Sequence, residues 1–301
     1  MTDHSPLDGA ADEPVNITMV TYNRAAFTRR SIESIAATAG FPYELTVVDN
    51  ASRDETGPLL RDLHERGVIG RLILNDENRG VAYAANQGWV AGGKGRYMKI
   101  DNDIVFTKPD WLARIVEVCD ALPDAGAVAY NFETTSYPLQ EVAGQRVRPK
   151  LGNVGGCCVM IPERVHRLVG YWCEDYAPYS EEDSDMYVRL RQLGLRSYYM
   201  ADEDVGLHLP EGKATPVLDR GRRTLFDEGD PAYRAQKDRW RTRYAGRRGL
   251  RRINQSLYAT GLRPLYIEHG EPYRPSLLAR AFVAARFLRL DRWEAPVPAD
   301  A

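Results

Sequence analysis

The fold class follows from residues 15–50, which read VNITMVTYNRAAFTRRSIESIAATAGFPYELTVVDN. The first seven residues are apolar and β-branched enough for a strand, and the polar residues 22–24 interrupt that pattern at its carboxyl end. Apolar residues between 32 and 39 then recur at helical spacing, and Gly40 is placed to end the helix in a left-handed conformation. Residues 45–49 read as a second strand. The segment is therefore predicted to be a βαβ unit.

The same alternation continues along the chain. Further strands are predicted at 71–75, 96–101, 126–130, 153–161 and 195–201, and further helices around 59–63, 82–89, 112–119, 162–169 and 182–193. The pattern dissolves between residues 137 and 150, and the second half is less regular than the first. Alternating strands and helices predict an α/β fold, Rossmann-like, with a mostly parallel central sheet flanked by helices.

Composition and charge exclude several classes of protein. The 301 residues carry 40 Lys and Arg against 42 Asp and Glu, so no global field attracts polyanions and no nucleic-acid partner is expected. Residues 1–14 are polar and acidic and predict a flexible tail, and the apolar run 277–290 is interrupted by arginines and too short to cross a membrane. The four cysteines show no CxxC pair, which favours reduced thiols and a cytoplasmic protein.

Two carboxylates end a predicted core strand in KIDND, residues 99–103. Ligands of open parallel sheets collect beyond the carboxyl ends of the strands, so Asp101 and Asp103 are expected to project into a crevice. Mg²⁺ and Mn²⁺ prefer such oxygen ligands, and either cation neutralises charge on a departing diphosphate. The alternative is that these acids only cap the turn after the strand.

With these motifs the chain resembles the inverting nucleotide-sugar glycosyltransferases of family 2, which have the GT-A fold, over roughly residues 15–210. The resemblance rests on motifs in order: VTYNR (20–24), VVDNAS (47–52), NRGVAYAANQG (78–88), DND (101–103), GG (155–156), EEDSD (181–185) and VRLRQLG (188–194). It implies a nucleotide-binding half, about 15–103, and an acceptor half, about 104–210. Residues 211–301 are expected to form an Arg-rich, mainly helical extension.

The resemblance also implies roles for individual residues. Those that would contact the donor are Thr21, Tyr22, Asn23 and Arg24 around the base, Asp49 on its ring N–H, Asn78, Gly80 and Asn86 at the ribose or diphosphate, Lys99, Asp101 and Asn102 on the DND strand, and Gly155 and Gly156 beneath the sugar. Asp101 would also lie in the metal region, and Asp103 would bind the metal directly. The alternatives are ordinary turns, helix caps, a lysine–acid pair and a small-residue strand.

A second carboxylate cluster is expected to supply the base. The family's Glu-Asp motif falls best on Glu182 and Asp183, and Asp183 is the candidate general base for removing the acceptor proton. Crowding of carboxylates raises the pKa of such a base toward working pH, although acids also favour the first turn of a helix for its dipole alone. His208 falls where many family members place a histidine that completes the metal site, and as a lone histidine it is otherwise an ordinary polar residue.

The resulting hypothesis is transfer of a sugar with inversion, from a UDP-sugar or alternatively a TDP-sugar, to the hydroxyl of a glycan, lipid-linked, natural-product or peptide acceptor. A sugar-phosphate nucleotidyltransferase is disfavoured because TYNRAAF lacks a glycine-rich phosphate loop. A non-catalytic scaffold that binds a polyanion or membrane through the Arg-rich residues 219–252 stays as a third reading. Peripheral membrane contact and association of two copies through the last segment also stay open.

Overall fold

The computed structural model describes residues 13–93, 95–132, 137–150, 154–174, 182–192, 194–202 and 204–209. The predicted tail, apart from its last two residues, and the whole Arg-rich extension lie outside this part. The strands are β1 (Val15–Thr21), β2 (Tyr43–Asp49), β3 (Arg71–Leu74), β4 (Tyr97–Asp101), β5 (Ile104–Phe106), β6 (Ala125–Ala129), β7 (Gln140–Val142), β8 (Gln145–Lys150), β9 (Cys158–Ile161), β10 (Arg196–Met200) and β11 (Gly206–His208).

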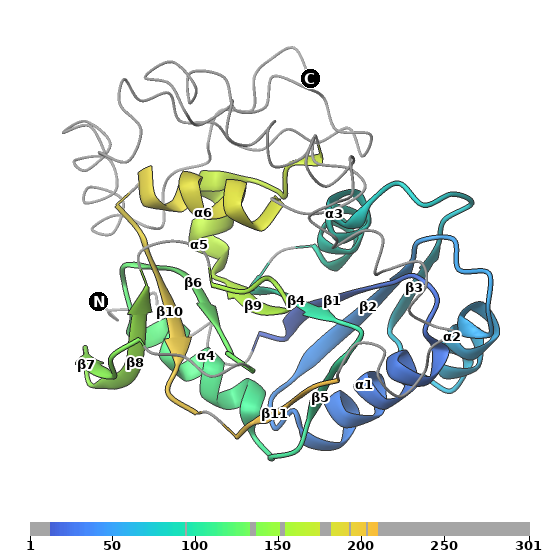
Figure 1. Ribbon diagram of the computed structural model, residues 1–301, viewed down its shortest axis with the longest axis horizontal. Coiled ribbons are helices and arrows are strands. Elements are labelled where there is room, and N and C mark those ends of the chain that lie inside the picture. Colours follow the sequence, from blue (N-terminus) through green and yellow to red (C-terminus); the bar gives the residue numbers. More distant parts are fainter. Residues whose placement is uncertain are drawn as a thin grey trace, which may run out of the picture.

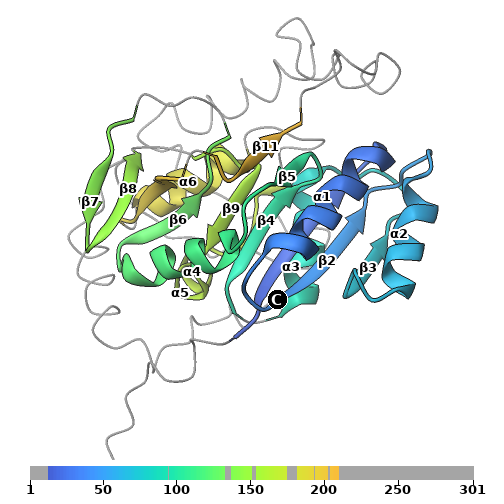
Figure 2. The ribbon, with the colours of Figure 1, turned by 90° about the horizontal axis from the view of Figure 1, so that it is seen from below.

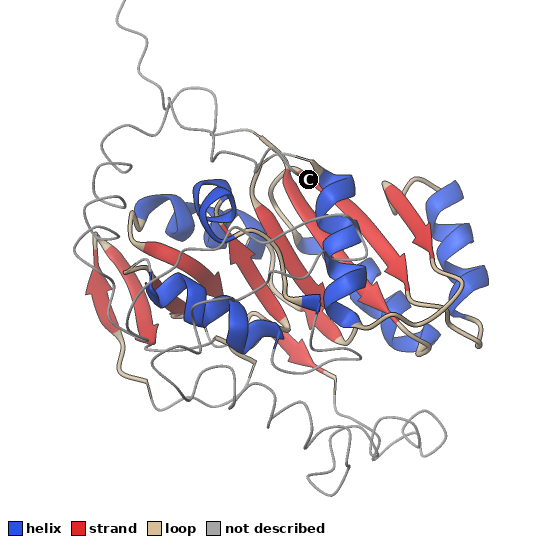
Figure 3. Ribbon diagram, turned by 90° about the horizontal axis from the view of Figure 1, so that it is seen from above, coloured by secondary structure: helices blue, strands red, loops and turns tan. Residues whose placement is uncertain are grey.

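Nine of these strands form one sheet in the order β3-β2-β1-β4-β9-β6-β10-β8-β7 (Figures 1 and 3). Strands β1 to β4 pair in parallel, as do β6 and β10. Strand β9 runs antiparallel between β4 and β6, and β8 runs antiparallel to β10 and β7. The predicted α/β fold with a mostly parallel central sheet is confirmed, and β9 joins the two parallel parts of that sheet.

Helices cover both faces of the sheet (Figures 1 and 2). They are α1 (Ala25–Thr38), α2 (Thr56–Glu65), α3 (Val81–Gly92), α4 (Trp111–Ala121), α5 (Glu163–Val169) and α6 (Glu182–Gln192). One apolar core joins α1, α2 and α4 to one face, and a second core joins α3, α5 and α6 to the other. The sheet is therefore the middle of three layers, and its strand ends are open to ligands at the edge between those layers.

Helix α3 lies unusually close to β1. A Cβ atom at Gly88 would come within 2.3 Å of the Thr18 side chain, so only glycine permits this approach. Gly40, which was predicted to end a helix, adopts a φ angle of 69°, and Gly194, which follows α6, adopts 76°. The predicted end at Gly40 is confirmed in the left-handed conformation that glycine favours.

The largest differences from the sequence-based expectation lie between residues 137 and 150. This segment forms the β7–β8 hairpin at the edge of the sheet, although its polar side chains show no clear strand period. Short strands β5 and β11 were also missed, and they pair with each other in a small separate sheet. The strand predicted at 153–161 begins only at Cys158.

None of the four cysteines forms a disulfide with another. Within the described ranges, no helix is both long enough and apolar enough to span a bilayer.

Candidate active site

The loops that follow β1 and β2 are tied together at the carboxyl ends of these strands. Asn23 and Arg24 both adopt left-handed backbone conformations, with φ of 58° and 70°. The N–H of Asn23 donates to Ser52 Oγ at 2.7 Å, and the Arg53 N–H donates to Asn23 Oδ1 at 2.9 Å. Left-handed non-glycine residues cost of order 1–3 kcal/mol each and persist where the surroundings impose them. The predicted base-binding loop is therefore held in one shape.

Asp49 ends β2 inside this arrangement. Its carboxylate accepts hydrogen bonds from the hydroxyl and the N–H of Ser52. Burial raises the pKa of Asp49, and the bonds from Ser52 lower it in part. The residue thus remains a hydrogen-bond acceptor at the strand end, while Tyr22 in the loop opposite is 43% exposed.

Asn50 organises the next loop and was missed by the sequence analysis. Its side chain is 2% exposed, and its amide donates to Asn78 Oδ1 at 2.7 Å and to the Gly80 carbonyl at 3.2 Å. Its carbonyl oxygen accepts the N–H of Arg79 at 3.2 Å. Asn78 also accepts the Gly80 N–H at 3.0 Å, so both predicted residues shape the entry to α3.

Asp103 lies between a guanidinium and an imidazole. Arg24 NH1 donates to Asp103 Oδ2 at 3.0 Å, and both side chains are buried. His208 Nε2 lies 3.4 Å from the other carboxylate oxygen, Oδ1. Strand β11 delivers the histidine because His208 pairs with Ile104, the residue after Asp103. The structure therefore brings together residues separated by about a third of the chain.

Asn102, the middle residue of the DND motif, points elsewhere. Its amide donates to Thr28 Oγ1 at 2.9 Å and to Thr21 Oγ1 at 3.3 Å, beneath α1. These contacts fix the turn that separates Asp101 from Asp103.

Lys99, which is buried, and Asp101, which is half-buried, form an ion pair on β4. Lys99 Nζ also donates to the Gly156 carbonyl at 2.9 Å. Burial alone lowers the pKa of Lys99, but the adjacent Asp101 carboxylate reverses that shift and raises the pKa above its ordinary value. Lys99 therefore stays an ammonium ion, and it links the DND strand to the paired glycines.

Asp183 lies directly against those glycines. A Cβ atom at Gly156 would be 3.4 Å from Asp183 Cβ, and the Ser184 N–H donates to Asp183 Oδ1 at 2.6 Å. Burial raises the pKa of Asp183, while that hydrogen bond and the charge of Lys99 lower it in part. Its neighbour Glu182 has a pKa raised to about 8, by burial first and then by the charge of Asp183. A carboxylate of raised basicity thus lies beside the paired glycines.

The protonation of Glu182 predicts a pH-dependent stability. The folded protein holds a proton on Glu182 up to about pH 8, whereas the unfolded chain releases it near the ordinary value of 4.5. Because the folded state binds more protons between these values, the free energy of unfolding falls as pH rises through this window. Urea unfolding across that range should show this fall. In the Glu182→Gln variant, the fall in the free energy of unfolding should be smaller. Equal slopes of that free energy against pH in the two proteins would contradict the raised pKa of Glu182.

Two other predicted residues bond to segments that are distant in the sequence. Asn86 is fully buried, donates to the Trp172 carbonyl at 2.9 Å and accepts the Trp172 N–H at 3.0 Å. It therefore fixes α3 to the segment after α5. The Gly155 N–H donates to Tyr199 Oη at 2.8 Å, which places a tyrosine that the sequence analysis did not single out beside the paired glycines.

Asp185, the last acid of the EEDSD motif, makes a structural ion pair. It is fully buried and pairs with Arg189 at 2.9 Å, one turn later on α6.

Of the three residues predicted to bind a metal, two lie next to each other and the third has a different partner. Asp103 and His208 offer a carboxylate oxygen and an imidazole nitrogen 3.4 Å apart, a donor set that suits Mn²⁺. Asp101 is paired with Lys99 instead. Across the described residues, no three His, Cys, Asp or Glu side chains are close enough together to hold a metal. Asp103 and His208 thus fit a cation that takes its remaining ligands from elsewhere, such as a diphosphate and water.

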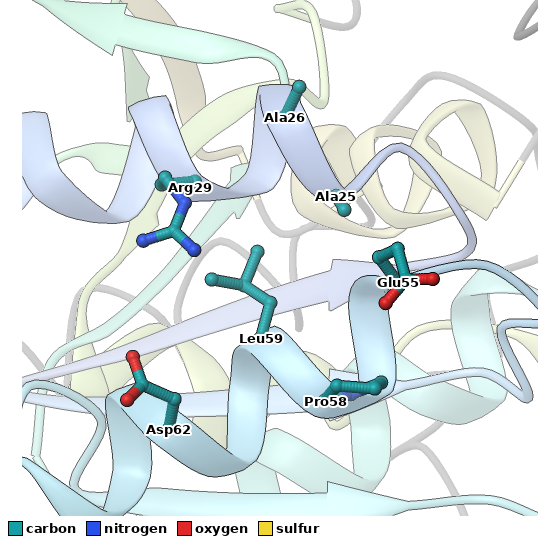
Figure 4. A pocket seen from close by; sticks show the side chains of 7 residues that line it. All are labelled: Ala25, Ala26, Arg29, Glu55, Pro58, Leu59 and Asp62. Atoms are coloured by element: carbon teal, nitrogen blue, oxygen red, sulfur yellow. The ribbon is translucent and has the colours of Figure 1, made fainter.

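A pocket between α1 and α2 lies apart from these groups. It is lined by Ala25, Ala26, Arg29, Glu55, Pro58, Leu59 and Asp62 (Figure 4). It contains none of the candidate residues, and Arg29 and Asp62 at its mouth are ordinary helix-surface side chains.

Comparison with known proteins connects this site to a family. Residues 16–155 match the model described as Glycosyl transferase family 2. The chain is 36% identical over 114 residues to the succinoglycan biosynthesis protein ExoO of Rhizobium meliloti, covering 37% of this chain and 32% of that protein. It is 31% identical over 118 residues to the glucosyl-dolichyl phosphate glucuronosyltransferase of Haloferax volcanii, covering 38% and 36%. The matches span about a third of the length of these relatives.

A solved structure shows the same fold. The mannosyltransferase PcManGT from Pyrobaculum calidifontis, in complex with GDP-Man and Mn²⁺, superposes with a TM-score of 0.54 at 22% identity, covering 75% of this chain and 61% of that one. This likeness shows a shared fold, a central sheet with helices on both faces. In sequence, residues 16–155 are similar to the glycosyl transferases of family 2. The expected resemblance to the family 2 glycosyltransferases is confirmed for this segment.

Proposed function

We propose that the protein transfers a sugar from a nucleotide diphosphate-sugar to an acceptor hydroxyl, with inversion at the anomeric carbon. The observation that carries this proposal is the contact of Asp183 with Gly156, beside the Lys99–Asp101 pair at the strand ends. A basic carboxylate there faces a backbone that has no side chain in the way. Direct displacement needs such a base on the acceptor side and charge stabilisation on the leaving-group side.

We assign the stabilisation of the leaving diphosphate to Asp103 and His208. These two residues would hold a divalent cation, Mn²⁺ or Mg²⁺, which neutralises charge on the departing diphosphate when bound. Arg24 holds Asp103 in place from its other oxygen. PcManGT was crystallised with Mn²⁺ and a nucleotide-sugar, which supports a divalent cation here.

The nucleotide would lie across the loops after β1 and β2. Asp49 offers a carboxylate to a base N–H, and Tyr22 offers an exposed ring beside it. Asn50, Asn78 and Gly80 shape the neighbouring loop, where backbone groups can meet the ribose or diphosphate. A UDP-sugar is the favoured donor and a TDP-sugar the alternative, while the GDP-Man bound to PcManGT makes GDP the third nucleotide to test.

The first test is calorimetric titration with UDP, TDP and GDP, each with Mn²⁺ and with EDTA. We expect one nucleotide to bind with micromolar Kd in the presence of Mn²⁺ and at least about tenfold more weakly without it, a difference of about 1.4 kcal/mol. Mg²⁺ in place of Mn²⁺ identifies the preferred cation. Absence of binding by all three nucleotides would contradict the proposed donor class and favour the scaffold reading.

A further inference from the structure

The paired glycines, Gly155 and Gly156, lie just before a strand and outside its pairing with its neighbours. Strand β9 begins at Cys158, and its register with β4 and β6 begins no earlier. Glycine reaches more backbone conformations than other residues, so two in succession do not fix their own geometry. A Cβ atom at Gly156 would nevertheless lie 3.4 Å from Asp183 Cβ and 3.6 Å from Asp183 Oδ2. The backbone directly against the candidate base therefore depends on other groups to hold it.

Two buried side chains hold this backbone. Tyr199 Oη accepts the Gly155 N–H at 2.8 Å. Lys99 Nζ donates to the Gly156 carbonyl at 2.9 Å. Tyr199 is 6% exposed and Lys99 is 5% exposed, so water has little access to either hydrogen bond. We call these two bonds the glycine clamp, and they fix one polar group of each glycine.

The strand register places the two clamp residues at the ends of one row of side chains. Lys99 of β4 pairs with Val159 of β9. Val159 pairs in turn with Ala129 of β6, and Ala129 pairs with Tyr199 of β10. Residues that pair directly share a face of the sheet, and these four neighbouring strands span about 14 Å (Figure 1). Because the two middle residues are small, the long side chains at the ends reach inward over them to the glycines.

This row lies on the face of the sheet that α6 covers. Val159, Ala129 and Tyr199 belong to the core that joins this face to α3, α5 and α6. Asp183 lies in the first turn of α6. The same glycine backbone therefore contacts the clamp on the sheet and the candidate base on the helix.

Lys99 is fully engaged in holding this backbone and the DND strand. Its ammonium is paired with Asp101 and bonded to the Gly156 carbonyl. A diphosphate that took Lys99 as a ligand would have to compete with both contacts. These contacts favour a role for Lys99 in holding the protein over a role in binding the donor.

We propose that Tyr199 and Lys99 are positioning residues for sugar transfer, which fix the paired glycines against Asp183 and leave nucleotide binding to other groups. Transfer requires the attacking oxygen, the anomeric carbon and the base to meet in one geometry, and a misplacement of about 1 Å can cost about 100-fold in rate. This inference rests on the proposed function and adds to it the groups that set the geometry beside the base.

The test compares two tyrosines that follow each other on β10. Tyr199→Phe removes the hydroxyl of the clamp and keeps the ring in the core. Tyr198→Phe is the matched control, because Tyr198 Oη donates to Asp124 Oδ1 at 2.9 Å and its ring packs in the opposite core. Each variant loses one hydroxyl of a buried tyrosine from the same strand, so a general loss of stability would affect both.

The measurement is release of the nucleotide diphosphate from the sugar donor of the nucleotide that binds, with water as the acceptor. In this reaction a water oxygen bonds to the anomeric carbon, its proton passes to Asp183, and the bond from that carbon to the diphosphate oxygen breaks. We expect Tyr199→Phe to lower kcat about tenfold, which is about 1.4 kcal/mol of activation free energy, with an unchanged KM for the donor. Tyr198→Phe should keep the kcat of the wild type.

Lys99→Met tests the other bond of the clamp. We expect it to lower kcat by a similar factor and to leave the nucleotide affinity in EDTA unchanged. The double variant with Tyr199→Phe should lose less than the product of the two single losses, because both bonds hold the same backbone. A loss equal to that product would overturn the shared clamp. A fall in nucleotide affinity as large as the fall in kcat would assign Lys99 to donor binding instead.

Hydrogen exchange tests the clamp apart from turnover. In protein labelled at the glycine nitrogens, the Gly155 amide should exchange faster in Tyr199→Phe than in the wild type, and at the wild-type rate in Tyr198→Phe. Wild-type turnover and exchange in Tyr199→Phe would overturn the inference alone, as would an equal loss of kcat in Tyr198→Phe. A wild-type protein that protects this amide but releases no nucleotide diphosphate from any donor would contradict the proposed function, and with it the role of the clamp in transfer.

Discussion

Asp183→Asn is expected to lower kcat by about 10²–10⁴-fold, the range that a positioned general base contributes. The amide keeps the oxygen that accepts the Ser184 N–H and occupies nearly the same volume against Gly156. It cannot take a proton at neutral pH. Because Asp183 is proposed to act on the acceptor side, nucleotide affinity should stay at the wild-type value, so that the loss is confined to turnover.

The measurement is steady-state release of the nucleotide diphosphate from the sugar donor of the nucleotide that binds, together with calorimetric titration of that nucleotide. Asp62→Asn is the control, since it removes an exposed carboxylate from α2 without touching the strand ends. Turnover by Asp183→Asn within a few-fold of wild type would rule out Asp183 as the base. If the turnover and the nucleotide affinity of Asp183→Asn both equal those of the wild type, the result would favour the hypothesis of a non-catalytic scaffold.

Asp103→Asn is expected to abolish the gain in nucleotide affinity that Mn²⁺ produces. The substitution removes the charged ligand and leaves a weaker amide oxygen, so metal affinity should fall by about 100-fold or more, since loss of outer-shell support alone costs 10–100-fold. Nucleotide affinity in EDTA should change little. The measurement is titration of Mn²⁺ at fixed nucleotide concentration.

Stability must be controlled in this experiment because Asp103 neutralises the buried Arg24. Breaking a buried ion pair on one side costs about 3–5 kcal/mol, so Asp103→Asn should also lower the Tm. The double variant Arg24→Met with Asp103→Asn removes both charges and isolates the metal effect. His208→Gln leaves the ion pair intact and should weaken Mn²⁺ binding alone. Full Mn²⁺ dependence in both variants would place the metal elsewhere.

The parallel part of the fold could be predicted because its signal is local. Strand β1 matches the predicted residues 15–21, and Gly40 ends α1 as expected. The β7–β8 hairpin could not be predicted, because its strands lie at the sheet edge and carry polar side chains on their exposed face. An edge strand of this kind has no apolar period to distinguish it from a loop.

The sequence predicted which residues belong to the candidate site, but it did not predict most of the contacts between their side chains. Asp103 and His208 were expected together, and they lie 3.4 Å apart. Three other contacts could not be predicted, because they depend on the direction of each side chain in three dimensions. Lys99 neutralises Asp101, Asn102 turns under α1, and Asn86 fixes Trp172. Asn50 stood beside a motif residue, but nothing in the sequence distinguished a loop hub from an ordinary turn asparagine.

The position of β9 limits how the chain can be divided. Residues 16–155, which match the family model, stop three residues before β9 begins, and β9 is the strand that covers the open side of β4. A fragment cut at that boundary would keep the motifs as far as Gly155 and leave the backbone N–H and C=O groups along one side of β4 unpaired. Such an edge templates pairing between copies, so the fragment is expected to aggregate more readily than the longer chain.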